Sequence, residues 1–258
     1  MRRVAVIGVA ALAAAVSAAW IFGSRRRSTT AVPGNLPGGG VTSALNSWLN
    51  GPLYRLVAEA LDLRPDDELL DVACGEGAFL AEHASSVSRI AGLDLSATKV
   101  ALARQRLANR IAAETGDVLQ GDAGTLPWDD GRFTVVTCMD AFPLFPDPET
   151  VLSEICRVLR PGGRAVTQVG WWVAKGTETH QILGGLSWVW SEAEVRRMVK
   201  DAGFDDVSIC YAPIAGDNRL GNLLGRLLMG TDEIRIVAAM KPLPSRGREE
   251  AAATTAIA

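Results

Sequence analysis

The sequence has little of what a metal or redox centre requires. Its 258 residues include two histidines, His83 and His180, and four scattered cysteines with no Cys-x-x-Cys pair. Because a metal site needs clustered ligands, we expect none, and the cysteines are predicted to be buried, reduced thiols. The net charge of −3 gives no broad basic field, so no nucleic-acid partner is expected.

Long apolar runs are also few, and the clearest one lies near the start, from Val4 to Phe22, with arginines on both sides. As a helix it would be about 28 Å long, close to the thickness of a bilayer core. Residues 1–23 therefore predict a membrane anchor. A cleaved signal peptide, a soluble alanine-rich helix and a misassigned start are the alternatives, and the flanking charges do not fix an orientation.

The remaining composition divides the chain further. Residues 24–40 are rich in Ser, Thr, Pro and Gly and predict a flexible linker, and residues 242–258 predict a disordered tail. Between them, residues 41–241 are numerous enough for one globular domain. This domain is expected to begin with a helical segment, Val41 to Leu63, broken near Gly51-Pro52.

From Glu68 onward, strand-like and helix-like patterns alternate. This alternation predicts an α/β fold with a parallel sheet covered on both faces. Ser96 is the expected N-cap of the second helix. The expected strands are 68–74, 90–94, 117–120, 133–139, 164–170, 206–212 and 234–240, and the expected helices are 77–85, 97–109, 147–159 and 191–202.

The first turn of this pattern carries a ligand-binding signal. An apolar strand ends at Gly75-Glu76-Gly77 and a helical pattern follows, so that a ligand can rest against bare backbone. Asp94 ends the next apolar segment. The glycine turn and this acidic residue together indicate a nucleoside-containing cofactor. A dinucleotide site would have a third glycine where Leu80 stands, which disfavours a nicotinamide-dependent reductase.

Further motifs follow in order along the chain. They are Leu70-Asp71-Val72-Ala73-Cys74-Gly75-Glu76-Gly77, Gly92-Leu93-Asp94-Leu95-Ser96, Gly121-Asp122-Ala123-Gly124-Thr125-Leu126-Pro127-Trp128, and Glu154-Ile155-Cys156-Arg157-Val158-Leu159-Arg160-Pro161-Gly162-Gly163. Over roughly 45–240 the series resembles the class I S-adenosylmethionine-dependent methyltransferases, specifically the type 11 small-molecule family. The resemblance implies a Rossmann-like, seven-stranded, mostly parallel sheet, here preceded by a single N-terminal hydrophobic helix.

The resemblance also implies S-adenosylmethionine as cofactor and a set of residues that hold it. Asp94 would accept hydrogen bonds from both ribose hydroxyls, or only cap the following helix. Asp122 would accept from the adenine amino group, or be a solvated loop residue. Asp71 would orient the turn or the methionyl ammonium, or be a buried structural carboxylate. The full expected set is Asp71, Ala73, Gly75, Gly77, Asp94, Leu95, Asp122, Ala123 and Met139.

Catalytic candidates are few. Many relatives carry a histidine pair after the fourth strand, where this chain has Asp140 and an apolar segment through Phe145. Asp140 is expected to contact substrate or the methionyl group, or to cap a turn. His180 is a candidate general base, or a surface histidine, and a base is needed only for an acceptor such as a phenol or enol.

Two insertions suggest the acceptor. Residues 171–190 hold four tryptophans, and residues 213–233 carry a stripe of leucines. Near the strand ends these segments favour a large apolar acceptor such as a quinone, isoprenoid or lipid, although they could also simply pack over the sheet or form a dimer contact. The oligomeric state is left open.

The predicted activity is methyl transfer by in-line displacement. Since S-adenosylmethionine is a cytosolic metabolite, a membrane-anchored domain facing the cytoplasm is expected, with a soluble cytoplasmic protein as the alternative. A non-catalytic S-adenosylmethionine-binding regulator is the alternative function. A nucleic-acid or protein methyltransferase is disfavoured by the absence of an Asn-Pro-Pro-Tyr motif after the fourth strand.

Overall fold

The computed structural model describes residues 54, 57–139, 141–168, 180–182, 187–213 and 233–243. The predicted N-terminal hydrophobic helix and the linker lie outside these residues, so the assignment of residues 1–23, 24–40 and 242–258 stays a prediction. Within the described ranges, none of the helices combines the length and hydropathy that crossing a membrane requires.

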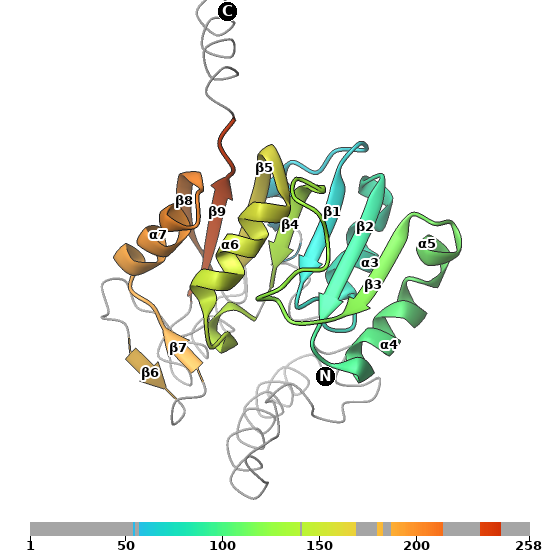
Figure 1. The fold of residues 1–258 in the computed structure, drawn as a ribbon, viewed down its shortest axis with the longest axis horizontal. Coiled ribbons are helices and arrows are strands. Elements are labelled where there is room, and N and C mark those ends of the chain that lie inside the picture. The colour runs from blue at the N-terminus through green and yellow to red at the C-terminus, as the bar shows by residue number, and fades with distance from the viewer. Residues whose placement is uncertain are drawn as a thin grey trace, which may run out of the picture.

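Seven strands form one mixed sheet in the order β3-β2-β1-β4-β5-β9-β8 (Figure 1). The first five pair in parallel, whereas β9 runs antiparallel to both β5 and β8. The strands are β1 (Glu68–Val72), β2 (Arg89–Asp94), β3 (Gly116–Gln120), β4 (Phe133–Cys138), β5 (Leu159–Gln168), β8 (Asp205–Pro213) and β9 (Glu233–Met240). All seven predicted strands are thereby confirmed.

The strand order creates a switch point between β1 and β4. The first strand, β1, lies in the middle of the sheet. From it the chain winds outward through β2 and β3, then returns and winds the other way through β4 and β5. In sheets of this kind, ligands bind where the winding reverses, beyond the carboxyl ends of the strands. The fold therefore places the loops after β1, β2, β3 and β4 around one site.

Helices cover both faces of the sheet, as expected. One face packs against residues 57–61, α3 (Ala78–His83) and α4 (Ala97–Arg106), and is called the α3 face here. The other packs against α6 (Pro148–Val158) and α7 (Glu192–Asp201), and is called the α6 face. Short helical segments complete the set: η2 (Ala84–Ser86), α5 (Ala108–Ala112) and η3 (Phe142–Leu144).

The core follows from alternation along the strands. In β1, Leu70 and Val72 belong to the cluster on the α6 face, whereas Leu69 belongs to the cluster on the α3 face. Successive side chains of a strand point to opposite faces, so these buried strands are apolar at nearly every position. Asp71 shares the face of Leu69, which places its carboxylate on the α3 face.

Three details differ from the sequence expectation. The helix predicted over 97–109 is divided at Leu107 into α4 and α5. The tryptophan-rich insertion contains a two-stranded hairpin, β6 (His180–Ile182) and β7 (Ser187–Val189), whose strands are too short for a periodic pattern to reveal. Cys74, Cys138 and Cys156 are buried as predicted, but Cys210 is exposed because β8 is an edge strand.

Candidate cofactor site

The loop between β1 and α3 is built from left-handed backbone. Ala73, Gly75 and Gly77 have φ of 58°, 57° and 71°. The Cys74 amide donates to the Leu93 carbonyl at 2.9 Å, and the Gly77 amide donates to the Cys74 carbonyl at the same distance. These bonds close the turn and fasten it to the end of β2. A left-handed alanine is costly for an L-residue, and such strain concentrates at functional sites.

The two glycines of this turn have different reasons to be glycine. A Cβ added at Gly75 would meet nothing within 4 Å, so open space lies over this position. A Cβ at Gly77 would lie 3.2 Å from Leu107 Cδ1 and 3.3 Å from the Ala103 Cβ. Gly77 therefore permits close packing of the turn on α4, whereas Gly75 leaves room for a ligand to approach backbone.

Asp94 connects this turn to the end of β2. Its side chain is buried, with Oδ2 accepting a hydrogen bond from the Gly75 amide at 2.8 Å and Oδ1 accepting from the Ser96 amide at 2.9 Å. Ser96 is the N-cap of α4, as predicted, and its Oγ accepts from the Lys99 amide at 3.4 Å. Each carboxylate oxygen retains a further lone pair, so Asp94 can organise the loop and still accept from a ligand.

Leu95 is an apolar side chain left in solvent beside this carboxylate. It is 52% exposed, while its carbonyl accepts a hydrogen bond from Gln120 Nε2 at 3.2 Å. The backbone is thus held by β3 and the side chain is presented outward. An exposed aliphatic surface next to a carboxylate can cover one face of an aromatic ring.

The loop after β3 brings a second carboxylate. Asp122 is exposed, and its Oδ1 accepts from the Gly124 amide at 2.8 Å, which forms a local turn. The Gly121 amide donates to the Asp94 carbonyl at 3.1 Å, which joins this loop to β2. Ala123 is 8% exposed and its side chain packs in the core on the α6 face, so any contact with a ligand would be made by its backbone.

An ion pair on α6 holds the loop after β3 by hydrogen bonds to its backbone. Arg157 donates to the Leu126 and Trp128 carbonyls at 2.9 and 2.8 Å, while Glu154 accepts from the Leu126 amide at 2.7 Å. Arg157 Nε also donates to Glu154 Oε1 at 2.7 Å. Hydrogen bonding to Arg157 lowers the pKa of Glu154, and the pKa of Arg157 is raised in turn. We call this pair and its loop contacts the α6 clamp.

Asp71 is held on the α3 face. Its side chain is 2% exposed and accepts a hydrogen bond from Thr137 Oγ1 on β4 at 2.8 Å. Burial, with the nearby charges of Asp71 and Asp94, raises the pKa of the Cys74 thiol. The thiol therefore stays protonated. The negative charges of Asp71 and Asp94 lie beside the turn and suit a cationic ligand.

The structure describes little of the two catalytic candidates. Asp140 lies outside the described residues. His180 is the first residue of β6 and pairs with Val189, but its side chain is not among those described. His83 is a core residue, with its ring centroid 4.7 Å from that of Phe79. In the part of the chain described, no group of three or more His, Cys, Asp or Glu could hold a metal ion.

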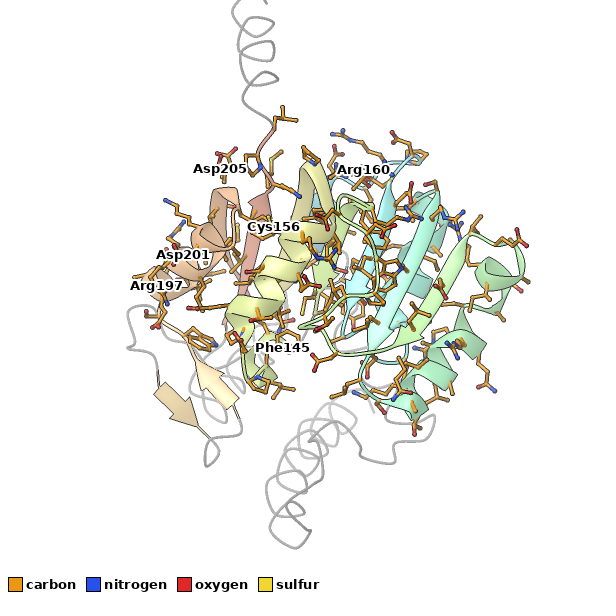
Figure 2. All side chains as sticks on the ribbon, viewed as in Figure 1. Phe145, Cys156, Arg160, Arg197, Asp201 and Asp205 are labelled. Carbon is orange, nitrogen blue, oxygen red and sulfur yellow. The ribbon has the colours of Figure 1, made fainter. Side chains whose placement is uncertain are left out.

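Apolar side chains gather where β4 ends. The segment after β4 forms η3, against which β7 packs. Leu144 is 43% exposed, and Phe145 is half-buried at the start of α6, on the side of the hairpin (Figure 2). Arg160 and Asp205 lie at the opposite end of the strands, near the starts of β5 and β8 (Figure 2). The leucine stripe at 213–233 falls mostly outside the described residues.

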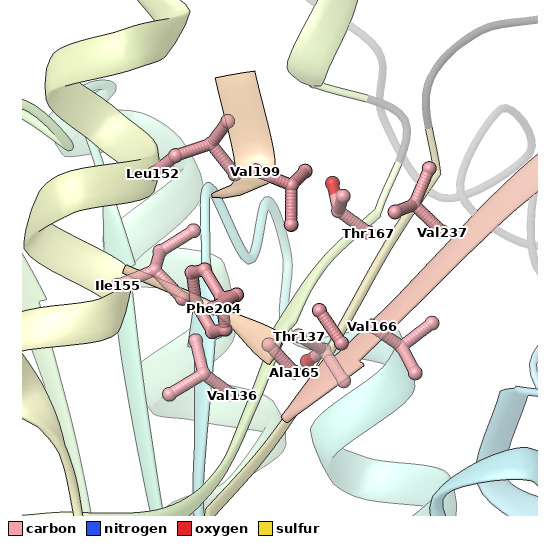
Figure 3. Close-up of a pocket in the computed structure, with 11 residues that line it drawn as sticks. Val136, Thr137, Leu152, Ile155, Ala165, Val166, Thr167, Val199, Phe204 and Val237 are labelled. Atoms are coloured by element: carbon pink, nitrogen blue, oxygen red, sulfur yellow. The ribbon is translucent and has the colours of Figure 1, made fainter. Parts of the chain in front are cut away.

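A small cavity elsewhere is not part of this site. It lies between the sheet and helices α6 and α7, bounded by side chains such as Ile155, Val199 and Phe204 (Figure 3). Its volume of about 10 Å³ matches a single water molecule rather than a cofactor. It is a packing defect of the core.

Sequence reasoning missed two features of the site region. One is the α6 clamp, for which the only signal in the sequence is the i, i+3 spacing of Glu154 and Arg157 on a helix. Gln168, at the end of β5, was not singled out. It is fully buried, and neither atom of its amide group has a hydrogen-bond partner among the residues described. A polar residue closing an apolar strand was the available signal.

The residues present fit an adenosyl sulfonium cofactor. The space over Gly75 admits a group against backbone, and Asp94 offers carboxylate oxygens beside it. Leu95 presents exposed apolar surface, while Asp122 and the backbone of Ala123 offer an acceptor and a donor nearby. A phosphate would instead require cationic side chains or a longer run of amides, and Asp71 and Asp94 make this turn acidic.

Comparison with known proteins shows similarity to methyltransferases. Residues 70–167 match the family model described as "Methyltransferase domain". The chain is 40% identical to a demethylmenaquinone methyltransferase of Lactococcus lactis over 101 residues, covering 38% of this chain and 40% of that protein. It is 26% identical to a sterol 4-C-methyltransferase of Caenorhabditis elegans over 135 residues, covering 52% of this chain and 39% of that protein.

A solved structure shares the fold. Geranyl diphosphate C-methyltransferase of Streptomyces coelicolor, determined with geranyl diphosphate and S-adenosyl-L-homocysteine, superposes with a TM-score of 0.60 at 19% identity, covering 74% of this chain and 77% of that one. The chain spans less than half the length of the two curated relatives named above, 40% and 39% respectively. The match is thus one of domain rather than of whole protein. Over residues 70–167 the chain is therefore similar to methyltransferase domains.

Proposed function

We propose that this chain transfers a methyl group from S-adenosylmethionine to a small apolar acceptor. The observation that carries the proposal is the contact between the Gly75 amide and Asp94, beneath open space at Gly75. This contact joins the ends of β1 and β2 into one cradle. The matched methyltransferase domain covers the same residues.

The chain's own residues bind and orient. Asp94 accepts hydrogen bonds from the ribose hydroxyls, Leu95 covers a face of the adenine, and Asp122 accepts from its amino group. Asp71, fixed by Thr137, contributes negative charge on the side of the cationic methionyl group. When bound, the cofactor supplies a methyl group on sulfonium, a strongly activated leaving group. The protein's contribution is alignment and the exclusion of water, which can lower a barrier by roughly 7–11 kcal/mol at best.

The apolar nature of the acceptor rests on the region after β4. Leu144 and Phe145 lie there instead of the histidine pair of many relatives, and the β6–β7 hairpin packs against η3. The named relatives act on demethylmenaquinone, a sterol and geranyl diphosphate, all with large apolar parts. Asp140 and His180 stay candidates for acceptor contact and proton removal.

Labelled transfer tests the proposal. The full chain is incubated with [methyl-¹⁴C]S-adenosylmethionine and a bacterial lipid extract, and label is counted in the organic phase. Label is expected to enter the organic phase, and Asp94→Asn is expected to reduce it at least tenfold. Label that enters only polar products would overturn the apolar acceptor. Cofactor binding without transfer to any acceptor would instead support the non-catalytic alternative.

We also propose that residues 4–22 hold the chain at a membrane, with the methyltransferase domain facing the cytoplasm. The support is the length and hydropathy of this sequence segment and the cytosolic supply of the cofactor. An anchored domain would meet an acceptor dissolved in the bilayer without extracting it into water.

A further inference from the structure

Gln168 is a buried amide that has no hydrogen-bond partner among the described residues. It is the last residue of β5, its side chain has no exposed surface, and neither Oε1 nor Nε2 is hydrogen-bonded within the described part of the chain. Buried polar groups are almost always paired, because an unpaired one gives up its bonds to water without replacement. A side chain kept only for packing would be better as methionine or leucine.

Its immediate neighbours are apolar. On β9, Ile236 stands directly opposite Gln168, and Ile236 belongs to the cluster on the α3 face. On β4, the pairing of Cys138 with Thr167 brings the next residue, Met139, alongside Gln168, and Met139 belongs to the same cluster. The amide is therefore surrounded on its own sheet by side chains that cannot satisfy it.

The place of Gln168 in the sheet points to the acceptor rather than to the cofactor. Apart from Met139, which follows β4, the residues expected to hold the cofactor stand at the ends of β1, β2 and β3. Strand β5 lies beyond β4 on the other side of β1. With neighbouring strands about 4.8 Å apart, β5 is about 10 Å from β1. Alternation in β5 puts Gln168 on the face of Val166, which is also the face of Asp71.

We propose that Gln168 is a specificity-determining residue that hydrogen-bonds a keto or hydroxyl oxygen of the acceptor. The inference rests on the proposed function and narrows it to apolar acceptors that carry a neutral oxygen. A primary amide suits this task because Nε2 donates to a carbonyl and Oε1 accepts from a hydroxyl without placing a charge in the pocket. A buried amide left unpaired rejects a molecule that lacks such an oxygen.

The test compares Gln168→Met with wild type in the full chain. Methionine has a similar shape but no amide, and Gln105→Met on the exposed surface of α4 is the matched control. Four quantities are measured: the thermal midpoint, the Kd for S-adenosyl-L-homocysteine by calorimetry, and the kcat and apparent KM for labelled transfer into a bacterial lipid extract. Mass spectrometry of the labelled products reports whether they contain a keto or hydroxyl oxygen.

The expected changes in thermal midpoint and in kcat/KM distinguish a functional role of the amide from a structural one. Gln168→Met is expected to keep or raise the thermal midpoint, to leave the Kd unchanged within twofold, and to lower kcat/KM for transfer at least tenfold. The labelled products of the wild type are expected to carry a neutral oxygen. Gln105→Met is expected to change none of these quantities.

Other results overturn the inference. A lower thermal midpoint in Gln168→Met would show that the amide is structural. Unchanged transfer, or products without a keto or hydroxyl oxygen, would show that it does not read the acceptor. If wild type binds no S-adenosyl-L-homocysteine, the proposed function itself fails and the role of Gln168 fails with it. An active wild type with an equally active variant refutes the Gln168 role alone.

Discussion

At the scale of single residues, two glycines in the turn after β1 have different roles that the sequence does not distinguish. Gly75 and Gly77 both have positive φ, so an alanine at either position is strained by about 1–2 kcal/mol. Only at Gly77 would the added methyl group also press on Leu107 and Ala103. Stability and ligand binding should therefore respond differently to the two substitutions.

Gly75→Ala is expected to lower the affinity for S-adenosyl-L-homocysteine more than tenfold while costing only about 1–2 kcal/mol of unfolding free energy. The reason is that its Cβ would occupy the open space over the turn. Gly77→Ala is expected to cost more stability, about 2–4 kcal/mol, because overpacking adds to strain. Urea unfolding and calorimetry measure the two effects.

Gly131→Ala is the matched control for both. Its φ of 66° imposes the same backbone strain, and its Cβ would meet only Arg160 Cα at 3.9 Å and the Leu159 carbonyl oxygen at 4.0 Å, both ordinary contacts. It precedes β4, at the opposite end of the strands from Gly75. It should lose stability but keep full affinity. If Gly75→Ala binds the ligand as tightly as Gly131→Ala, the space over Gly75 is not the cofactor site.

His83 makes a prediction about pH. Burial lowers its pKa, so the folded protein binds this proton less readily than the unfolded chain, whose histidine pKa is about 6.5. The stability that His83 contributes is full above that pH and is lost as pH falls below it. His83→Gln is therefore expected to flatten the loss of stability between pH 7.5 and 5.5.

Chemical denaturation at several pH values measures this slope. His180 is present in both proteins, so the difference between the two slopes isolates His83. Equal slopes in wild type and variant would contradict a depressed pKa at this position.

At the scale of elements, α6 supports the loop that carries Asp122. The α6 clamp fixes the loop through the Leu126 amide, the Leu126 carbonyl and the Trp128 carbonyl. A lysine in place of Arg157 cannot make this forked set of bonds. The helix thus positions a loop of the proposed cofactor site through hydrogen bonds to its backbone.

Arg157→Lys is expected to lower unfolding free energy by about 1–3 kcal/mol, since hydrogen bonds from a charged group are lost. It is also expected to weaken S-adenosyl-L-homocysteine binding several-fold, because the loop with Asp122 loosens. Thermal unfolding and calorimetry check both. Arg197→Lys is the control: Arg197 bridges Glu149 and Asp201 on the exposed side of α7 (Figure 2), and its replacement should change little. Unaltered affinity in Arg157→Lys would show that the α6 clamp serves stability alone.

At the scale of the whole molecule, the fold was largely predictable because it depends on patterns that one segment can display. Buried parallel strands such as β1 and β4 are short apolar runs, and α6 has an unbroken apolar stripe. The α/β alternation then fixes the covering of both faces. The positions of Gly75 and Asp94 followed from the same reasoning, since each ends a predicted strand.

What could not be predicted depends on contacts between distant segments. The antiparallel insertion of β9 between β5 and β8 has no local signal, and neither does the three-residue pairing of β6 with β7. Cys210 looked like a core residue because a lone strand does not reveal that it is an edge. The unpaired state of Gln168 and the reach of Arg157 to Leu126 likewise appear only when neighbouring elements are assembled.

Membrane association is a prediction at this scale. The full chain is expected to float with lipid vesicles in a density gradient, and a variant with Ala11, Ala14 and Ala15 changed to Asp should remain in the dense fraction. The measurement is the fraction of protein that floats. A variant that floats as well as wild type would contradict anchoring by residues 4–22.

The central claim is that the cradle formed by Gly75 and Asp94 holds an adenosyl ligand. Titration calorimetry of the full chain with S-adenosyl-L-homocysteine tests it most directly, using Asp94→Asn and, as a control, Asp117→Asn on the exposed side of β3. We expect a clear heat of binding with the wild type, an affinity at least tenfold weaker in Asp94→Asn, and an unchanged affinity in Asp117→Asn. No heat with the wild type, or equal affinity in Asp94→Asn, would contradict it.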